Sequence, residues 1–283
     1  QEELGKNRVI DTPLAEASII GIALGAAFSG MRPIAEIQFS DFIWPAANQL
    51  IGEAARACYG SNGNLWAPMV IRIPYGGGIR GGLYHSQNIE AYLFHTPGLK
   101  ICAPATPYDA KGLLIASIND PNPVMFLEHK KLYRKPDLKM DVPKGLYEVE
   151  LGKAKVIKEG TDVTIVAWSG MVPVVKEAAS ILEEEGISVE VLDLCSIIPI
   201  DDEAILTSVE KTSNLCIVQE DVPFSSVASE ISSLVAEKGF WSLDNPIKKI
   251  TPPNTHIPFA PILEDAFIPD VDKVVREIKE LGS

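Results

Sequence analysis

The segment Pro68-Met-Val-Ile-Arg-Ile-Pro-Tyr-Gly-Gly-Gly-Ile-Arg-Gly-Gly-Leu-Tyr-His-Ser-Gln87 passes from an apolar run into a loop in which five of seven consecutive residues are glycine. Glycine offers no side chain to a core, so these residues indicate a loop whose backbone is closely approached. A strand that leads into such a loop is typical of the carboxyl edge of an α/β sheet, where ligands bind. The loop ends on His85, one of four histidines. A mobile surface loop with an incidental histidine explains the pattern equally well.

Helical and strand-like patterns alternate on both sides of this segment. Upstream, Thr12 is the expected N-cap and Pro13 the first residue of a helix that reaches Ser29. The face of this helix consists of small residues, which admit a neighbouring backbone or a cofactor. Strands are expected at residues 33–37, 68–73, 99–102 and 123–127, with helices at 43–58 and 107–118. This order predicts parallel strands joined by helical crossovers.

The alternation divides into two units, separated by a stretch rich in Lys, Pro and Asp. We expect a first domain over residues 1–135, a linker over 136–150 and a second α/β domain over 151–283. In the second domain, strands are expected at 162–168, 188–194 and 215–219, with helices at 172–185, 202–209, 227–237 and 271–281. A chain of 283 residues is long enough for two such cores. The predicted fold class is α/β, with two domains that each contain a parallel sheet flanked by helices.

The composition excludes several kinds of partner. The formal net charge is −13 and the pI about 4.8, which argues against binding to nucleic acid or to an anionic membrane. The longest apolar stretch, residues 17–28, is too short to span a bilayer, and no signal peptide is visible. Four widely spaced cysteines without a C-x-x-C pair indicate buried thiols in a reducing compartment. We expect a cytoplasmic protein, or one of the mitochondrial matrix if a leader has been removed.

General catalytic motifs are absent. The chain has no G-x-x-x-x-G-K-[ST] loop, no G-x-G-x-x-G turn between strand and helix, no zinc-like histidine spacing and no G-x-S-x-G elbow. Three features remain: Glu16 in a helical first turn, His85 in the glycine loop, and the segment Gln38-Phe-Ser-Asp-Phe-Ile-Trp44. Each has an ordinary explanation. A first-turn acid stabilises its helix dipole by roughly 0.3–1 kcal/mol, and the three aromatic side chains are more often core than a cofactor platform.

Several motifs in the right order resemble one family, the β subunits of thiamine-diphosphate-dependent 2-oxoacid dehydrogenases, which belong to the decarboxylating first component. The similar stretches are Arg8-Val-Ile-Asp-Thr-Pro-Leu-Ala-Glu16, Pro33-Ile-Ala-Glu-Ile-Gln-Phe-Ser-Asp-Phe42, Gly81-Gly-Leu-Tyr-His-Ser-Gln87, Pro97-Gly-Leu-Lys100 and Asp109-Ala-Lys-Gly-Leu113. The similarity covers nearly the whole chain. It implies a pyrimidine-binding domain followed by a transketolase-type C-terminal domain, in agreement with the two α/β units. Glu128 with Lys131-Leu-Tyr-Arg134, Ala167-Trp168 and Ser229-Glu-Ile-Ser-Ser233 resemble branched-chain members more than pyruvate members.

The resemblance implies roles for five residues. Glu16 matches the glutamate that hydrogen-bonds the aminopyrimidine ring, where a carboxylic acid favours the imino tautomer that takes the proton from the thiazolium carbon. His85 matches the active-site histidine, which orients or protonates intermediates and acts during acyl transfer to lipoamide. Leu14, Gln38 and Phe42 fall at positions that line the aminopyrimidine pocket. Branched-chain members often have Tyr at the position of Phe42, so this chain would lack a hydroxyl contact there.

The resemblance also implies bound ions. Asp120 and Asn122, with Ser117 and the backbone near Met69 and Val70, match a potassium-binding loop of some members, although Val70 has no hydroxyl to offer. This chain has no Gly-Asp-Gly…Asn loop to hold magnesium and the diphosphate. The α subunit would supply that loop, so this chain would be inactive alone. The glycine loop would then present His85 across a subunit interface, and without partner or cofactor we expect it to be among the least ordered segments.

The chain departs from the family at three places. A segment that usually precedes the motif at Arg8, including the first strand of the domain, is absent. Cys195 stands where the family usually has Arg, and Val222-Pro-Phe-Ser-Ser226 lacks the usual Gly-Gly. The last two departures lie in the C-terminal domain. We therefore expect them to affect the docking of other subunits or of the core component first, and the chemistry only after that.

The resemblance therefore predicts the β subunit of an α2β2 branched-chain 2-oxoacid dehydrogenase. Such an enzyme decarboxylates 2-oxoacids with thiamine diphosphate and transfers the acyl group to lipoamide on a dihydrolipoamide acyltransferase core. Pyruvate or acetoin dehydrogenase is the alternative within this enzyme class. A catalytically silent β-like assembly or regulatory partner is the alternative from a different class. This chain alone does not define the acyl preference, because both subunits contact the substrate.

Overall fold

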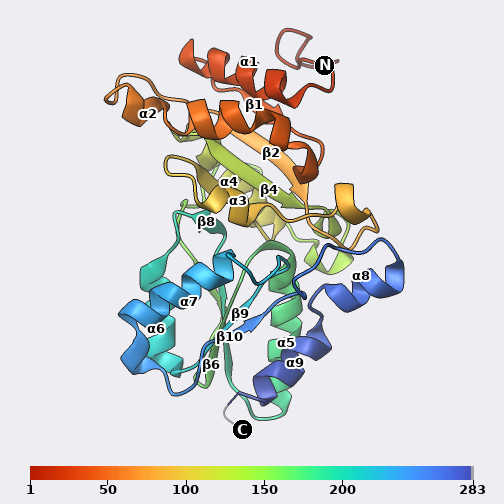
Figure 1. Cartoon of the computed structure of the whole chain (residues 1–283), viewed down its shortest axis with the longest axis vertical. Coiled ribbons are helices and arrows are strands. Elements are labelled where there is room, and N and C mark those ends of the chain that lie inside the picture. The colour runs from red at the N-terminus through yellow and green to blue at the C-terminus, as the bar shows by residue number, and fades with distance from the viewer. Residues whose placement is uncertain (282–283) are drawn as a thin grey trace.

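Two sheets organise the chain, one in each half, in the computed structural model, which describes residues 1–281 (Figure 1). In the first sheet the strands run parallel except β8, which is antiparallel to β3. The strand order is β1 (Ile34–Glu36), β2 (Val70–Tyr75), β4 (Val124–His129), β3 (Lys100–Cys102) and β8 (Ser196–Ile198). Because β8 comes from the second half of the chain, the second domain completes the sheet of the first.

The second sheet has the same character. Its strands are parallel except β5, which is antiparallel to β7 at the outer edge. The strand order is β10 (Lys248–Ile250), β9 (Leu215–Val218), β6 (Val163–Ala167), β7 (Val189–Asp193) and β5 (Lys155–Lys158). The central strands β6, β7 and β9 are buried along their whole length, as expected for parallel strands covered on both faces.

Helices cover both faces of the second sheet (Figure 1). Helices α5 (Val172–Glu184) and α9 (Val271–Lys279) pack on one face, and α6 (Asp202–Thr212) and α7 (Val227–Lys238) on the other. Successive residues of a strand pack alternately against the two layers of helices, because their side chains point to opposite faces of the sheet. Ile165 and Cys216 belong to the layer of α5 and α9, whereas Val166 and Ile217 belong to that of α6 and α7.

The first sheet is covered in the same way. Helix α1 (Glu16–Phe28) shares a core with Ile71 and Ile73 of β2, whereas α4 (Pro107–Asn119) packs with Val70 and Phe126 on the opposite face. The core on the α1 side continues through Trp168 into the second domain. Three shorter helices complete the fold, namely α2 (Ala57–Gly60), α3 (Glu90–Phe94) and α8 (Pro261–Phe267). The two domains are thus joined by one continuous apolar core.

Side-chain caps define where several helices begin. Thr106, Asp201, Ser226 and Asp270 each accept a backbone N–H from the first turn of α4, α6, α7 and α9 respectively. Such a cap contributes about 0.5–2 kcal/mol. Pro107 at the start of α4 adds a preset backbone angle where no N–H is needed.

The predicted start of α1 is wrong. The helix begins at Glu16 with Ala15 as its N-cap, so Thr12 caps nothing and Pro13 lies outside the helix. The N–H of Ala15 donates to the carbonyl of Pro13 at 2.9 Å, and this tight turn breaks the helical path. The position of Glu16 in the first turn is confirmed, but the small residues do not share one face, because Ala23 and Ala27 are buried and Gly25 is exposed.

The continuous helix expected at residues 43–58 is also wrong. The structure has 3₁₀ turns at Ser40–Phe42 and Trp44–Ala46, a π-helical stretch at Asn48–Ala54, and then α2. The other predicted helices and strands are present, with ends that move by a few residues.

The sequence patterns missed the edge strands β5, β8 and β10 and the helices α3 and α8. Elements of three to seven residues give a weak periodic signal, although the equally short β1 and β3 were predicted. The predicted α/β fold class, with two domains of mostly parallel sheet, is confirmed. All four cysteines are free, and Cys102, Cys195 and Cys216 are buried. Among residues 1–281 no helix combines the length and apolarity needed to cross a membrane.

Candidate functional site

The candidate site lies at the carboxyl edge of the first sheet. Strand β2 ends at Tyr75 and β4 ends at His129, and these two residues are paired in register. The glycine loop follows Tyr75 directly, as the sequence predicts. Ligands of α/β proteins bind outside this edge of the sheet, so the segments after β2 and β4 are the ones that can carry chemistry.

The structure brings His85 together with two aromatic rings. His85 follows the 3₁₀ turn Gly82–Tyr84, and its ring meets those of Phe39 and Phe42 edge-on, with centroids 4.6 and 5.5 Å apart. The hydroxyl of Ser40 donates to the carbonyl of Gln87 at 2.9 Å, which joins the turn carrying Phe42 to the segment carrying His85. No ring nitrogen of His85 has a hydrogen-bond partner among residues 1–281. The imidazole is held in place and its nitrogens are open to a ligand.

Glu16 stands at the amino end of α1 and is partly buried. Its carboxylate has no hydrogen bond or ion pair within the described part of the chain. A first-turn carboxylate stabilises the helix dipole without a bonded partner, and one left open at a helix start can also receive a ring N–H of a ligand. No described contact links Glu16 to His85. Leu14 is 75% exposed and Gln38 is exposed, so neither is yet enclosed in a pocket of this chain.

A buried lysine stands behind the aromatic rings. Nζ of Lys130 lies 4.8 Å from the centroid of Phe39 and is buried without a hydrogen-bond partner among the residues described. Burial lowers the pKa of Lys130 to about 8, although the charges of Asp41 and Glu220 oppose this. Burial also raises the pKa of Asp41, one of whose carboxylate oxygens is unpaired. Sequence reasoning missed both residues, although Lys130 directly follows a buried strand.

The glycine loop packs against the second domain, and its composition reflects that contact. A Cβ on Gly77 would lie 2.6 Å from Cδ1 of Ile257 and 2.9 Å from Cδ1 of Ile268. Gly76 has a φ of +81°, and a Cβ there would lie 2.3 Å from Nε2 of His129. The prediction of close approach to the backbone is confirmed, and the neighbours are residues of both domains of this chain. Disorder of the loop without a partner or cofactor stays a prediction.

Acidic side chains gather where the two domains meet. Glu220 is bonded to His129, with Oε2 2.8 Å from Nε2. Burial alone would raise the pKa of Glu220, but the charge and hydrogen bond of His129 and the N–H of Gly77 lower it to about 2. Burial and the charge of Asp221 raise the pKa of Glu90 to about 8, while Trp168 donates to Glu90 at 3.3 Å. The sequence analysis did not predict this group of acids. The position of Glu220 just after a buried strand was the one feature that could have marked it as a candidate.

Several groups of the expected potassium loop already bond within the chain, and Val70 could contribute only its backbone carbonyl. The carboxylate of Asp120 holds the ammonium group of Lys100 and the amides of Asn122. The hydroxyl of Ser117 donates to a helix carbonyl, the carbonyl of Met69 accepts an N–H in the sheet, and Val70 offers a hydrocarbon side chain.

The guanidinium of Arg32 also occupies the carbonyls of Ile118 and Asp120. These groups do not form an open oxygen cage in this arrangement. We derive no step through potassium, and its binding stays a prediction.

A second acid cluster is internally satisfied. Ligand atoms of Asp109, Asp193 and Cys195 lie within 4.8 Å of one another, all buried. The ammonium group of Lys155 pairs with Asp109, and the N–H of Cys195 donates to Asp193 at 3.0 Å. Burial raises the pKa of Asp193 to about 7. With a lysine already bound, this cluster serves the packing of the two domains.

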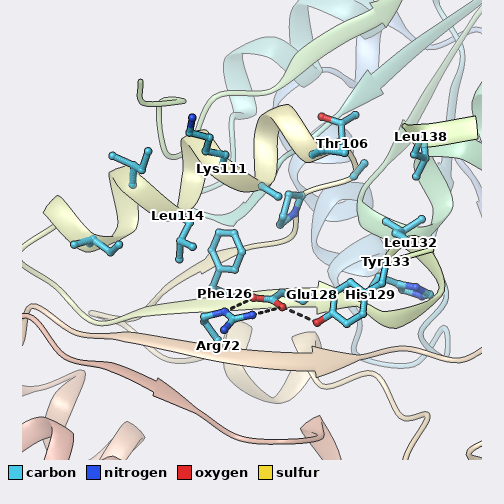
Figure 2. A pocket seen from close by; sticks show the side chains of 16 residues that line it. Arg72, Thr106, Lys111, Leu114, Phe126, Glu128, His129, Leu132, Tyr133 and Leu138 are labelled. Carbon is cyan, nitrogen blue, oxygen red and sulfur yellow. Dashed lines mark hydrogen bonds and ion pairs between the residues drawn. The ribbon is translucent and has the colours of Figure 1, made fainter. Parts of the chain in front are cut away.

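A well-formed pocket lies elsewhere and contains none of the five expected cofactor residues. It has a volume of about 460 Å³ and lies between α4, β4 and the segment after β4 (Figure 2). Its walls are mostly apolar, including Leu114, Phe126 and Leu132. At its base Glu128 accepts from Arg72 at 2.6 and 2.8 Å and from the hydroxyl of Tyr133 at 2.6 Å. These three polar groups satisfy one another, whereas Nδ1 of His129, which also lines the pocket, is buried without a hydrogen-bond partner among the described residues.

Comparison with known families divides the chain in two. Residues 1–136 match the transketolase pyrimidine-binding domain, and residues 152–274 match the transketolase C-terminal domain. Among solved structures, a split-gene transketolase described as an inactive β4 tetramer is similar, with a TM-score of 0.75 and 25% identity. That alignment covers 94% of this chain and 81% of the transketolase chain.

Three curated relatives are similar over nearly the whole chain. The 2-oxoisovalerate dehydrogenase subunit β of Bacillus subtilis is 47% identical, covering 99% of this chain and 86% of the relative. The pyruvate dehydrogenase E1 component subunit β of Acholeplasma laidlawii is 46% identical, covering 100% and 85%. The acetoin:2,6-dichlorophenolindophenol oxidoreductase subunit β of B. subtilis is also 46% identical, covering 99% and 81%.

Proposed function

Because this chain belongs to the family of 2-oxoacid dehydrogenase E1 component β subunits, with transketolase-type pyrimidine-binding and C-terminal domains, we propose that it acts in the oxidative decarboxylation of branched-chain 2-oxoacids. The acyl product passes to lipoamide on a dihydrolipoamide acyltransferase core. The observation that carries the proposal is the open carboxylate of Glu16 at the start of α1 in the pyrimidine-binding domain.

The residues present fit the aminopyrimidine side of thiamine diphosphate. When bound, this cofactor supplies a nucleophilic carbon and an electron sink for decarboxylation. Glu16 holds a proton between its carboxylate and a ring nitrogen, a role for which an otherwise unpaired carboxylate is suited. His85, steadied by Phe39 and Phe42, presents a ring nitrogen that donates or accepts a proton at the substrate oxygen. Leu14, Gln38 and Phe42 complete the expected pocket wall.

An α subunit is the proposed partner, in an α2β2 tetramer. Leu14, two residues before Glu16, is 75% exposed, and Ile22 on α1 and Met31 just after it are 67 and 62% exposed. Large exposed apolar side chains along this helix favour a covering subunit. That subunit would also bring the magnesium ion and hold the diphosphate. We place the complex in the cytoplasm, with the mitochondrial matrix as the alternative.

The choice of a branched-chain substrate rests on sequence resemblance. The three curated relatives differ by one percentage point of identity, 47, 46 and 46%, so they do not discriminate between branched-chain, pyruvate and acetoin types. Glu128 and Tyr133, two of the residues that favour the branched-chain type, bond to each other and to Arg72 at the base of the pocket in Figure 2. They support the fold there, and no described bond links them to His85.

The test is reconstitution with the α subunit of the same source. The rates of 2-oxoisovalerate decarboxylation, pyruvate decarboxylation and acetoin cleavage to acetaldehyde should rank 2-oxoisovalerate first. The Glu16→Gln variant should lose about 10²- to 10⁴-fold in rate, the usual contribution of a positioned proton-transfer group. Glu203→Gln is the matched control, because Glu203 also lies in a helical first turn but is exposed on α6.

Other outcomes are informative. Full activity of the purified chain without an α subunit would contradict the proposed assembly. A faster rate on pyruvate or acetoin would replace the branched-chain assignment. If Glu16→Gln leaves the rate of the complex unchanged, the chain is a silent β-like partner.

A further inference from the structure

Two buried carboxylates of the second domain bind the backbone of the glycine loop. Glu264 of α8 is fully buried and accepts the N–H of Gly78 at 3.0 Å and that of Arg80 at 3.2 Å. It also accepts from the guanidinium of Arg80 at 2.6 Å. Glu220 accepts the N–H of Gly77 at 2.5 Å. Together these bonds form what we call the carboxylate clasp, made by Glu220 and Glu264 around residues 77–80.

The clasp holds the loop in a backbone conformation that the residues of the loop do not favour by themselves. Arg80 has a φ of +64°, in the left-handed region that side chains other than glycine rarely adopt. The backbone N–H and the guanidinium of Arg80 both donate to Glu264, so this carboxylate holds Arg80 in that conformation. Gly82 is similarly constrained, since a Cβ there would lie 2.9 Å from Cδ2 of Phe259. The second domain therefore shapes the loop from Gly77 to Gly82.

The clasp is connected to His85 over a short and bonded path. The N–H of Gly81 donates to the hydroxyl of Ser86 at 3.1 Å, which closes a turn around His85. The N–H of Gly76 donates to the carbonyl of Gln87 at 3.3 Å, so the two ends of the loop are tied. A displacement of residues 77–80 would move both neighbours of His85.

The clasp is also costly to open. A carboxylate that leaves its N–H donors while still buried keeps its charge without compensation. Glu220 retains His129 when the loop moves, but Glu264 would lose the loop N–H groups and the guanidinium of Arg80. The loop and α8 are thus expected to move as one body.

We propose that Glu264 and Glu220, which belong to the C-terminal domain, are positioning residues that fix where the His85 side chain lies. The proposal rests on the proposed function, because it takes His85 as the group that touches the substrate. The carboxylates themselves touch only the loop and His129 or Asn88. Through them the second domain, which carries none of the expected cofactor residues, controls the geometry of the catalytic imidazole.

The test compares Glu264→Gln with Asp265→Asn in the complex reconstituted with its α subunit. A glutamine keeps the size of Glu264, but its amide replaces one acceptor oxygen with an NH2 group, which cannot accept the N–H groups of Gly78 and Arg80. Asp265 is the matched control, because it is an exposed neighbour on α8 that binds the guanidinium of Arg80 and no backbone N–H among the described bonds. We expect kcat for lipoamide acylation to fall about 10- to 100-fold in Glu264→Gln, as for a misplaced catalytic group. KM and the affinity for thiamine diphosphate should stay close to those of Asp265→Asn. The unfolding temperature should fall in Glu264→Gln, because a buried carboxylate that accepts from Gly78 and Arg80 is lost, so kcat is compared per folded complex.

Amide hydrogen exchange supplies a readout that does not depend on activity. In the wild-type complex, Gly77, Gly78 and Arg80 should exchange slowly, and in Glu264→Gln at least Gly78 and Arg80 should exchange faster. Exchange of these amides at the rate of exposed ones in the wild type overturns the clasp, even if the variant cannot be purified. Unchanged kcat with loosened amides overturns the positioning role. A fall in kcat that only follows a fall in the folded fraction also overturns it.

The two proposals fail in different ways. A wild-type complex that is inactive on 2-oxoisovalerate, pyruvate and acetoin overturns the proposed function, and with it the role of His85. An active wild-type complex in which Glu264→Gln is as active as Asp265→Asn overturns only the positioning role.

Discussion

Oε2 of Glu220 lies 2.8 Å from Nε2 of His129, so a buried bond joins the end of β4 in the first domain to the segment after β9 in the second. The other carboxylate oxygen of Glu220 accepts the N–H of Gly77 in the glycine loop. One side chain therefore links both sheets and the segment that presents His85. Residues that hold catalytic geometry here lie at the junction of the domains, away from the pyrimidine pocket itself.

We expect Glu220→Gln to lower the free energy of unfolding by about 3 kcal/mol, since removing one partner of a buried charged pair leaves the other uncompensated. Urea unfolding measures the change. Glu237→Gln, an exposed position on α7, is the control and should change little. A double variant that also carries His129→Gln should lose less than the sum of the two single variants. Strict additivity would show that the pair does not interact.

The Glu90→Gln variant should change how stability depends on pH. Burial and the charge of Asp221 raise the pKa of Glu90 to about 8 from its ordinary value of 4.5. Between these values the folded chain keeps a proton that the unfolded chain loses, so wild-type stability falls as the pH rises and levels off above about 8. Urea unfolding at about pH 5 and about pH 9 should show a smaller fall in Glu90→Gln, with a difference of order 3 kcal/mol. Parallel curves for both proteins would contradict the raised pKa.

Replacing Gly77 by alanine should detach the loop from the second domain. Its Cβ would overlap Ile257 and Ile268, both buried, at a cost of roughly 1–3 kcal/mol. Gly145→Ala is the matched control, because no atom lies within 4 Å of a Cβ at that position. Thermal unfolding and limited proteolysis near residues 76–82 measure the effect. Equal stability of the two variants would show that the loop is not packed as described.

Removing the ammonium group of Lys100 tests the expected potassium loop. Lys100→Met leaves Asp120, whose side chain is 9% exposed, without its cation and should cost about 1–3 kcal/mol. If residues 117–122 bind potassium once the lysine is gone, the loss should be partly recovered in potassium chloride but not in tetramethylammonium chloride. The same stability in both salts would reject the site. Lys144→Met, an exposed position without an ion pair among the described ones, is the control.

Local patterns were sufficient for most long elements but not for short ones. Short stretches of sequence were enough to predict β4, β6 and α4. A strand buried on both faces is a continuous apolar run, and a capped helix begins with a recognisable cap residue. The start of α1 could not be predicted, since the turn from Ala15 to Pro13 competes with a helix that Thr12 and Pro13 would otherwise favour. Edge strands such as β8 exist only because a partner strand is already in place.

The candidate site shows the same division. Phe42 and His85 were expected to act together, and their rings are in contact. Lys130, Glu220 and Glu264 were not foreseen, because their relation to the site depends on contacts between segments far apart in the chain. Glu264, for example, is 186 positions away from the residue whose N–H it accepts.

The sequence by itself determined the α/β class, the family resemblance and the segment that carries His85, because strand burial, helix caps and glycine content are properties of short stretches. The reason for the five glycines came only from the tertiary structure. Gly77 and Gly82 lie against Ile257, Ile268 and Phe259 of the other domain, whereas Gly76 and Gly78 lie against His129 and Lys131 of their own domain. No local pattern records which distant carboxylate a backbone N–H will meet, since that pairing follows from the packing of the two domains.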